Sequence, residues 1–273
     1  MGLDTAEFDY LCQFVHEQSA IIIDPGKEYL VESRLTPLAY QEGMESAQKL
    51  LEHLRREPPN GLHRKVLDAM TNNETIFFRD AAPFQALRQA IIPEFLRKRA
   101  AERKLSFWSA AASSGQEAYS LAMLMCEDFA GLQGWSVSIL GTDISTAILN
   151  RARQGRYSQL EVNRGLPAKC LTKFFRREGV EWQISGSIRK LVEFREMNLA
   201  EAWPALPQFD VIFLRNVLIY FSVEKKKEIL RRVRSVLHQD GVIFLGTAET
   251  TLNLDDSFER VAWENTSYYR IRR

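Results

Sequence analysis

The chain lacks the patterns that mark disulfide-rich and zinc-binding proteins. Its 273 residues include only three cysteines, Cys12, Cys126 and Cys170, which are scattered and form no Cys-x-x-Cys pair. The four histidines show no spacing typical of metal ligands. We therefore expect no metal site, and a reducing compartment, the cytoplasm, as the place where the protein works.

Long hydrophobic runs are also missing. No apolar segment approaches the roughly 20 residues that cross a bilayer. The first ten residues, MGLDTAEFDY, are acidic, whereas a secretory signal begins with basic residues. We therefore expect no direct insertion into a membrane.

Net charge is small but unevenly distributed. The formal value of +1 argues against nucleic acid as a partner. Residues 1–71 carry 12 acidic and 7 basic side chains, a balance of −5, and the remainder carries 23 and 29, a balance of +6. This asymmetry predicts two domains with different partners or with mutual attraction.

Apolar side chains recur at helical spacing through residues 1–71, which predicts a small bundle of four helices. We expect Asp24 or a neighbour to cap the second helix, Pro37 to kink or end it, and Ser46 to cap the third. Residues 72–98 are then expected to form a linker and the first helix of a second domain.

Over residues 99–273 the pattern changes to short apolar strands separated by helices. The expected strands are LSFWSAA, WSVSILGTDI, LVEFREMNL, FDVIFLRN and GVIFLGTA. The expected helices are Gln116–Phe129, Ser145–Arg153 and Val223–Leu237. This alternation predicts a mostly parallel, doubly wound α/β sheet. The alternating segment 267–273 is expected to return antiparallel to GVIFLGTA.

A stretch at about 157–190 does not fit this alternation. It contains a helix candidate, Pro167–Phe175, and two β-like runs, VEWQI (180–184) and SIRKLVEF (187–194). We expect a small antiparallel β-subdomain inserted into the sheet domain.

Polar side chains follow four of the expected strands, where ligands bind in open α/β sheets. The first strand leads into small residues, Ala110–Ser114, and then Gly115, without the glycine patterns that bind dinucleotides or triphosphates. Asp143, Asn198 and Asn216 follow other strands. A carboxylate suits ribose hydroxyls, and amides suit a purine edge or an amino-acid group. S-adenosylmethionine, a nucleoside without pyrophosphate, fits this set.

Each of these residues also has a purely structural interpretation. Asp143 is suited to cap a helix, Glu117 to the first turn of one, and Asn216 to a turn. Tyr119 is expected to be a core residue of its helix. The functional interpretation depends on polar residues occurring at four strand ends at once.

Four motifs together resemble one family. TNNETIFFRD (71–80), FWSAAASSGQEAYSLAM (107–123), LGTDIS (140–145) and FLRNVLIYF (213–221) closely resemble the chemotaxis receptor methyltransferases, the CheR family. The resemblance implies a class I, Rossmann-like methyltransferase sheet with a small antiparallel β-subdomain insertion, preceded by a small all-α N-terminal domain. It also implies transfer of a methyl group from S-adenosylmethionine to receptor glutamates, with S-adenosylhomocysteine as the other product.

The resemblance carries the family's site residues onto matching positions of this chain. The implied cofactor-binding residues are Asn73, Thr75, Arg79, Glu117, Asp143, Asn198, Leu199, Asn216 and Val217. Glu117 is expected at the methionyl amino group, Asp143 at the ribose, and residues 198–199 beside the adenine. Arg79 and Tyr220 are the residues that the family associates with methyl transfer, and no metal is implied.

The linker motif places Arg79 directly behind Phe77 and Phe78. We expect the two rings to anchor the linker in the domain interface and Arg79 to lie at the mouth of the cofactor site. The alternative is a salt bridge from Arg79 to Asp80 or to the helical domain. A glutamate substrate has a pKa of about 4.3, so near neutral pH it needs no general base.

The resemblance implies the cytoplasmic domains of methyl-accepting chemotaxis receptors as partners, and a monomer. This chain departs from the family at Gln116 and Ala118, where Glu and Pro are usual, but it keeps Glu117. The loop 176–180 is short where some members carry a glycine-rich hairpin that binds a receptor pentapeptide, so we expect a pentapeptide-independent enzyme. The helical domain is acidic, although the family contacts receptors through a basic face there.

Other classes of function remain open. A module that binds S-adenosylmethionine as a signal would not need Arg79 and Tyr220. A nicotinamide-dependent oxidoreductase would need the missing glycine pattern. A nucleic-acid methyltransferase is disfavoured by the low net charge and by RNVLIYF (215–221) in place of an Asn/Asp-Pro-Pro-Tyr motif.

Overall fold

The N-terminal domain consists of four helices, as predicted. The computed structural model describes residues 3–129 and 134–272. The helices are α1 (Thr5–Ser19), α2 (Glu28–Gln41), α3 (Ala47–Arg56) and α4 (Gly61–Met70). Their apolar faces form a separate core, in which Leu11, Leu35 and Leu51 are fully buried.

Two details of these helices differ from the prediction. The Ser46 side chain caps α3 by accepting a hydrogen bond from the Lys49 amide, as expected. Asp24 does not cap α2, because its carboxylate pairs with Lys27 (Nζ–Oδ2 2.6 Å), and Lys27 precedes α2 without a side-chain cap. Pro37 was expected to kink or end the second helix; it lies inside α2, which continues to Gln41, so it does not end the helix, and a kink stays a prediction.

The second domain is built on a seven-stranded sheet in the order β6-β2-β1-β7-β8-β10-β9. The five predicted strands are β1 (Lys104–Ala110), β2 (Ser136–Asp143), β6 (Val192–Glu196), β7 (Phe209–Leu214) and β8 (Leu237–Leu245), and they run parallel. β10 (Thr266–Ile271) pairs antiparallel with β8, which confirms the expected return. The outer strand β9 (Phe258–Trp263) was not predicted.

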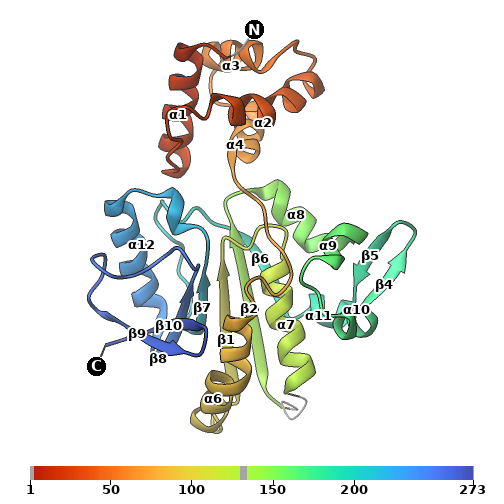
Figure 1. The fold of residues 1–273 in the computed structure, drawn as a ribbon, viewed down its shortest axis with the longest axis vertical. Coiled ribbons are helices and arrows are strands. Elements are labelled where there is room, and N and C mark those ends of the chain that lie inside the picture. Colours follow the sequence, from red (N-terminus) through yellow and green to blue (C-terminus); the bar gives the residue numbers. More distant parts are fainter. Residues whose placement is uncertain (1–2, 130–133, 273) are drawn as a thin grey trace.

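Helices cover both faces of this sheet (Figure 1). One face packs against α7 (Gln116–Asp128) and the consecutive helices α5 (Ala82–Ala86), η1 (Leu87–Ile91) and α6 (Ile92–Lys98). The other face packs against α12 (Val223–Val236). α8 (Thr146–Gln154) lies along β2 and β6. Because the central strands are buried on both faces, they are nearly continuous apolar runs in the sequence.

The insertion is a three-stranded antiparallel sheet in the order β3-β5-β4, flanked by short helices. Its elements are β3 (Arg156–Ser158), α9 (Gln159–Asn163), α10 (Ala168–Phe174), β4 (Phe175–Glu178), β5 (Glu181–Ile184) and α11 (Gly186–Arg189). VEWQI forms β5 and the helix candidate forms α10, as expected. SIRKLVEF is not a strand of the insertion: it supplies most of α11 and then the first half of β6 in the main sheet.

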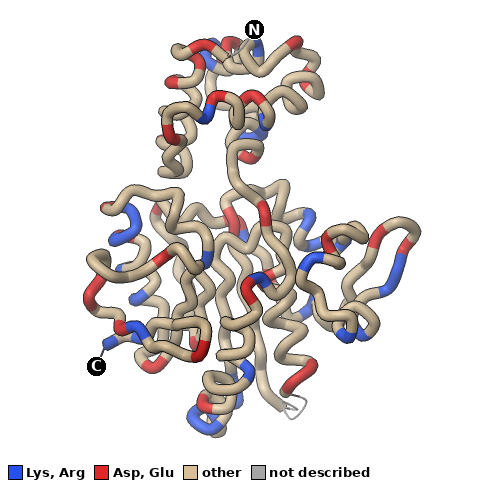
Figure 2. Tube along the Cα trace, viewed as in Figure 1, with Lys and Arg blue, Asp and Glu red and all other residues tan. Residues whose placement is uncertain are grey.

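The helical domain stands over the carboxyl ends of the parallel strands (Figure 1). Asn198 Nδ2 donates to Gln18 O (2.8 Å), and the Ile22 amide donates to Tyr220 O (3.0 Å). Acidic residues are prominent along its trace (Figure 2). Within residues 3–129 and 134–272, no helix combines the length and apolar character needed to cross a bilayer.

Candidate active site

Phe77 anchors the linker that joins the two domains. Its ring is fully buried, edge-on to Tyr157 (centroids 5.0 Å apart) and Phe175 (5.6 Å) of the insertion. A Cβ atom on Gly165 would lie 2.0 Å from the Phe77 carbonyl oxygen, so the linker passes directly over this glycine. Phe78 packs edge-on to Phe84 of α5 (centroids 5.1 Å apart). Both rings therefore pack within the second domain, and the expectation that they anchor the linker in the domain interface was wrong.

Arg79 occupies a turn with an uncommon backbone. Its neighbours Phe78 and Asp80 have φ values of 48° and 54°, in the left-handed region that costs a side-chain-bearing residue roughly 1–2 kcal/mol. The Phe78 amide donates to Ser120 Oγ (2.9 Å), which holds this turn in place. Arg79 Nη1 donates to the Glu74 carbonyl oxygen (3.3 Å), and the guanidinium forms no ion pair with a carboxylate of the described residues. The expected alternative, a salt bridge to Asp80 or to the helical domain, was wrong.

Asp80 pairs instead with Arg215, the residue that follows β7. Arg215 Nη2 lies 2.6 Å from Asp80 Oδ2, and Nη1 lies 3.1 Å from Glu117 Oε2. The Arg215 side chain is 1% exposed, so one buried guanidinium pairs with both carboxylates. Ser109 Oγ donates to the other oxygen of Glu117 (2.7 Å). Burial raises the pKa of Glu117, and the Arg215 charge opposes that shift.

Asp143 ends β2 and is also buried. Its Oδ2 accepts from the Ser113 amide (2.9 Å) and its Oδ1 from the Ser145 amide (3.0 Å). Burial raises the pKa of Asp143, and these amide donors oppose the shift. Ser145 caps α8 by accepting from the Ile148 amide, so the capping interpretation of Asp143 was wrong.

The loop after β7 brings Tyr220 to the same edge. Asn216 has a φ of 57°, which confirms its suitability for a turn, and a 3-10 turn, η2 (Leu218–Tyr220), comes next. The Tyr220 hydroxyl accepts from Asn72 Nδ2 (2.7 Å). Its backbone oxygen accepts from the Ile22 amide, so both the linker and the helical domain hold Tyr220.

All ten predicted site residues lie around two adjoining hollows at the carboxyl edge of the sheet. The first is lined by Asn73, Thr75, Arg79, Glu117, Asp143, Asn216, Val217 and Tyr220. The second is lined by Asn198, Leu199, Asp143, Val217 and Tyr220. Ile21 of the helical domain lines both hollows and was not predicted. Arg215 was also missed, although it directly precedes a predicted residue.

The two domains of the chain match two parts of one family. Residues 6–71 match the family part described as "CheR methyltransferase, all-alpha domain". Residues 73–266 match "CheR methyltransferase, SAM binding domain". The chain belongs to the CheR methyltransferase family.

Named relatives of this CheR-family chain are similar over their whole length. It is 39% identical over 265 residues to chemotaxis protein methyltransferase Cher2 of Pseudomonas putida, with 96% of each chain covered. It is 39% identical over 276 residues to chemotaxis protein methyltransferase 1 of Pseudomonas aeruginosa, with 100% of each covered. It is 38% identical over 269 residues to chemotaxis protein methyltransferase 1 of Vibrio cholerae, with 97% of each covered.

The pocket of this CheR-family chain has groups that fit S-adenosylmethionine. Glu117, whose side chain is 12% exposed, and the buried Asp143 offer carboxylates, which suit a cationic amino group and a pair of ribose hydroxyls. Leu199 and Val217 offer apolar surface of the kind that covers a purine ring. The small residues Ala111 and Ser113, both with positive φ, bring the backbone close to the hollow.

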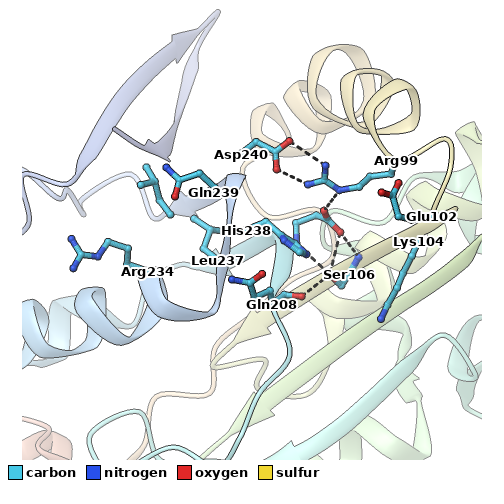
Figure 3. Close-up of a pocket in the computed structure, with 12 residues that line it drawn as sticks. Arg99, Glu102, Lys104, Ser106, Gln208, Arg234, Leu237, His238, Gln239 and Asp240 are labelled. Carbon is cyan, nitrogen blue, oxygen red and sulfur yellow. Dashed lines mark hydrogen bonds and ion pairs between the residues drawn. The ribbon is translucent and has the colours of Figure 1, made fainter. Parts of the chain in front are cut away.

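A separate hollow, of about 840 Å³, lies at the amino edge of the strands in the CheR-family sheet (Figure 3). Here Arg99 pairs with Asp210 (Nε–Oδ1 3.0 Å) and with Asp240, and the Ser106 amide donates to Asp210 (2.8 Å). The hydrogen bond from Arg99 lowers the pKa of Asp240. The three central charges of this hollow are paired with one another. We therefore interpret it as a structural cluster that joins α6, β7 and β8.

Proposed function

We propose that this protein transfers the methyl group of S-adenosylmethionine to glutamate side chains of methyl-accepting chemotaxis receptors. The products are a glutamate methyl ester and S-adenosylhomocysteine. Family membership and the names of relatives 39% identical over nearly the whole chain support the reaction. The observation that carries the proposal concerns Arg79. Its guanidinium has no carboxylate partner among the described residues, and Arg79 lines the same hollow as Glu117 and Asp143.

The proposed mechanism depends on placement rather than on acid–base chemistry. S-adenosylmethionine supplies a methyl group that is already activated by its sulfonium. The substrate glutamate is ionised near neutral pH, since its pKa is about 4.3. Arg79 holds this carboxylate through a forked, charge-assisted contact, and Tyr220 orients the attacking oxygen. Well-oriented reactants can lower a barrier by as much as about 7–11 kcal/mol.

The remaining site residues are proposed to bind the cofactor. Glu117 takes its amino group, Asp143 its ribose, and residues 198–199 its adenine. The other contacts are assigned to Asn73, Thr75, Asn216 and Val217. Their common position around the two hollows supports this assignment.

The proposal extends to the setting of the enzyme. We assign residues 1–71 to the helical domain, 72–98 to the linker and first helix, and 99–273 to the methyltransferase domain, with the insertion at about 157–190. The substrates are the cytoplasmic domains of receptors, and the enzyme is a cytoplasmic monomer. Pentapeptide independence is supported by the β4–β5 turn, in which only two residues join the strands.

Calorimetric titration with S-adenosylhomocysteine, followed by transfer of labelled methyl to a panel of receptor cytoplasmic domains, tests the proposal. We expect binding, and a label on at least one receptor that base releases. Absence of binding contradicts the cofactor assignment. Binding without transfer to any receptor that carries methylatable glutamates contradicts the assigned reaction.

A further inference from the structure

The loop after β8 contains a carboxylate that collects four backbone amides. Glu249 Oε2 accepts from the amides of Gly246 (2.7 Å) and Asn216 (2.7 Å). Glu249 Oε1 accepts from the amides of Val217 (2.9 Å) and Ile219 (3.2 Å). Three of these four donors belong to the loop after β7, which is distant from Glu249 in the sequence.

Those three amides lie where the regular hydrogen bonding of the sheet ends. Asn216 and Val217 follow the last residue of β7, and Ile219 lies in the short 3-10 turn η2, whose first amides have no acceptor within the turn. Asn216 adopts a positive φ of 57° at this point. A single ionised carboxylate therefore satisfies a stretch of backbone that would otherwise be unpaired, and it does so with charge-assisted bonds.

Gly246 shows how closely the two loops approach. A Cβ atom there would lie 2.7 Å from Glu249 Oε2 and 2.8 Å from Asn216 Nδ2. Contacts under about 3.0 Å force one of the groups to move. Glycine at position 246 thus leaves room for the carboxylate to reach the β7 loop.

The loop whose amides bind Glu249, residues 216–219, lines part of the candidate cofactor pocket, but Glu249 itself does not. Asn216 and Val217 line the first hollow, and Tyr220 ends the same turn. Glu249 lines a neighbouring hollow instead. We propose that Glu249 is a positioning residue, which sets the shape of the cofactor pocket through the backbone of Asn216–Ile219. This inference rests on the proposed function, because it assigns a purpose to the same pocket.

The test combines hydrogen exchange and cofactor binding in the full chain. Glu249→Gln keeps the length of the side chain but replaces one acceptor oxygen by a donor that faces amide donors. We expect the amides of Asn216, Val217 and Ile219 to exchange about tenfold faster or more in the ligand-free variant. Each Glu249 oxygen accepts from two amides, so the glutamine variant loses two charge-assisted bonds. We expect S-adenosylhomocysteine to bind about tenfold more weakly or worse. The KM for S-adenosylmethionine should rise by a larger factor than kcat falls.

Two further variants make the result specific. Gly246→Ala crowds the same carboxylate from the other side and should shift exchange and binding in the same direction. Asp256→Asn removes a carboxylate that lines the same neighbouring hollow, and it should leave both measurements unchanged. Thermal unfolding of each variant confirms that the sheet is intact.

The outcomes distinguish a failure of the positioning role of Glu249 from a failure of the proposed function. If Glu249→Gln binds S-adenosylhomocysteine as tightly as the wild type, or keeps wild-type exchange at the three amides, the positioning role is overturned. If the wild type itself does not bind S-adenosylhomocysteine, the proposed function is overturned. Faster exchange confined to this loop, together with weaker binding, supports the role of Glu249.

Discussion

At the scale of single residues, Arg79 forms no ion pair within the described part of the chain, because its acidic neighbour is occupied elsewhere. Asp80 adopts a left-handed backbone and pairs with Arg215, which also pairs with Glu117. The guanidinium of Arg79 is then left with a contact to the carbonyl oxygen of Glu74. The left-handed backbone on both sides of Arg79 costs conformational free energy, and strained residues of this kind cluster at functional sites.

Replacing Arg79 by alanine should impair methyl transfer far more than cofactor binding. Loss of one donor positioned at the reacting group lowers kcat by about 10²–10³-fold in acyl-transfer enzymes, and we expect a loss of similar size here. The affinity for S-adenosylhomocysteine should change less than about threefold. Receptor methylation kinetics and calorimetry on the same preparation measure the two effects.

Arg164→Ala is the matched control for this prediction. Arg164 pairs with Glu74 on the same linker (2.9 Å) but does not line either hollow. Its removal should leave transfer nearly unchanged. Equal losses of transfer and of cofactor affinity in Arg79→Ala would assign Arg79 to cofactor binding instead.

The raised pKa of Glu117 predicts a pH dependence of cofactor binding. Burial makes this carboxyl retain its proton to a higher pH than an ordinary glutamate. The amino group of the cofactor requires the ionised form, so affinity for S-adenosylhomocysteine should increase as the pH rises through the raised pKa and then level off. Calorimetry at a series of pH values below about 8 measures this dependence, since the amino group of the cofactor stays charged there.

Glu117→Gln should bind more weakly and respond less steeply to pH. Part of the response should persist, because burial also raises the pKa of Asp143. If the glutamine variant followed the wild-type curve, Glu117 would not be the group that titrates.

At the scale of elements, burial decides what the sequence can predict. The central strands are apolar on both faces, so β1, β7 and β8 are recognisable as short hydrophobic runs. The edge strand β9 carries exposed charged residues and was missed. In the insertion, β3 and β4 are only three and four residues long, too short to show a period. The run after Gly186 was misread because it changes from helix to strand within a few residues.

A pair of glycines in the insertion tests the anchoring of the linker. Both Gly165 and Gly179 have positive φ, so alanine at either position should cost roughly 1–2 kcal/mol in the free energy of unfolding. Gly179 has open space around it, whereas a Cβ on Gly165 would collide with the Phe77 carbonyl oxygen. Gly165→Ala should therefore unfold at a lower denaturant concentration than Gly179→Ala.

Gly165→Ala should also reduce methyl transfer, because it displaces the linker that carries Arg79. Gly179→Ala should transfer at the wild-type rate. Indistinguishable unfolding midpoints for the two variants would show that the linker does not depend on this close approach.

At the scale of the whole molecule, the candidate site is assembled from distant parts of the chain. The strand-end residues were predictable, because parallel strands bring their carboxyl ends to one edge. The contribution of Ile21, the pairing of Asp80 with Arg215 and the reach of Glu249 were not, because no local pattern encodes contacts over such separations. The roles of the individual residues in binding and transfer remain predictions.

The helical domain contributes residues to the candidate site itself. Ile21 lines both hollows, and the Ile22 amide holds the backbone of Tyr220. Arg64 donates to the Ile144 carbonyl oxygen (2.7 Å) at the same edge. Any movement between the domains would therefore change the mouth of the pocket.

The chemical identity of the methylated group decides whether this chain is a glutamate methyltransferase. The full chain is incubated with S-adenosylmethionine and a receptor cytoplasmic domain, and the receptor is then digested and sequenced by mass spectrometry. We predict that glutamate side chains gain the mass of one methylene group, as a methyl ester requires, and that mild base removes it. With Arg79→Ala, the same modification should form far more slowly. A base-stable methyl group, or one on a residue other than glutamate, would contradict the account.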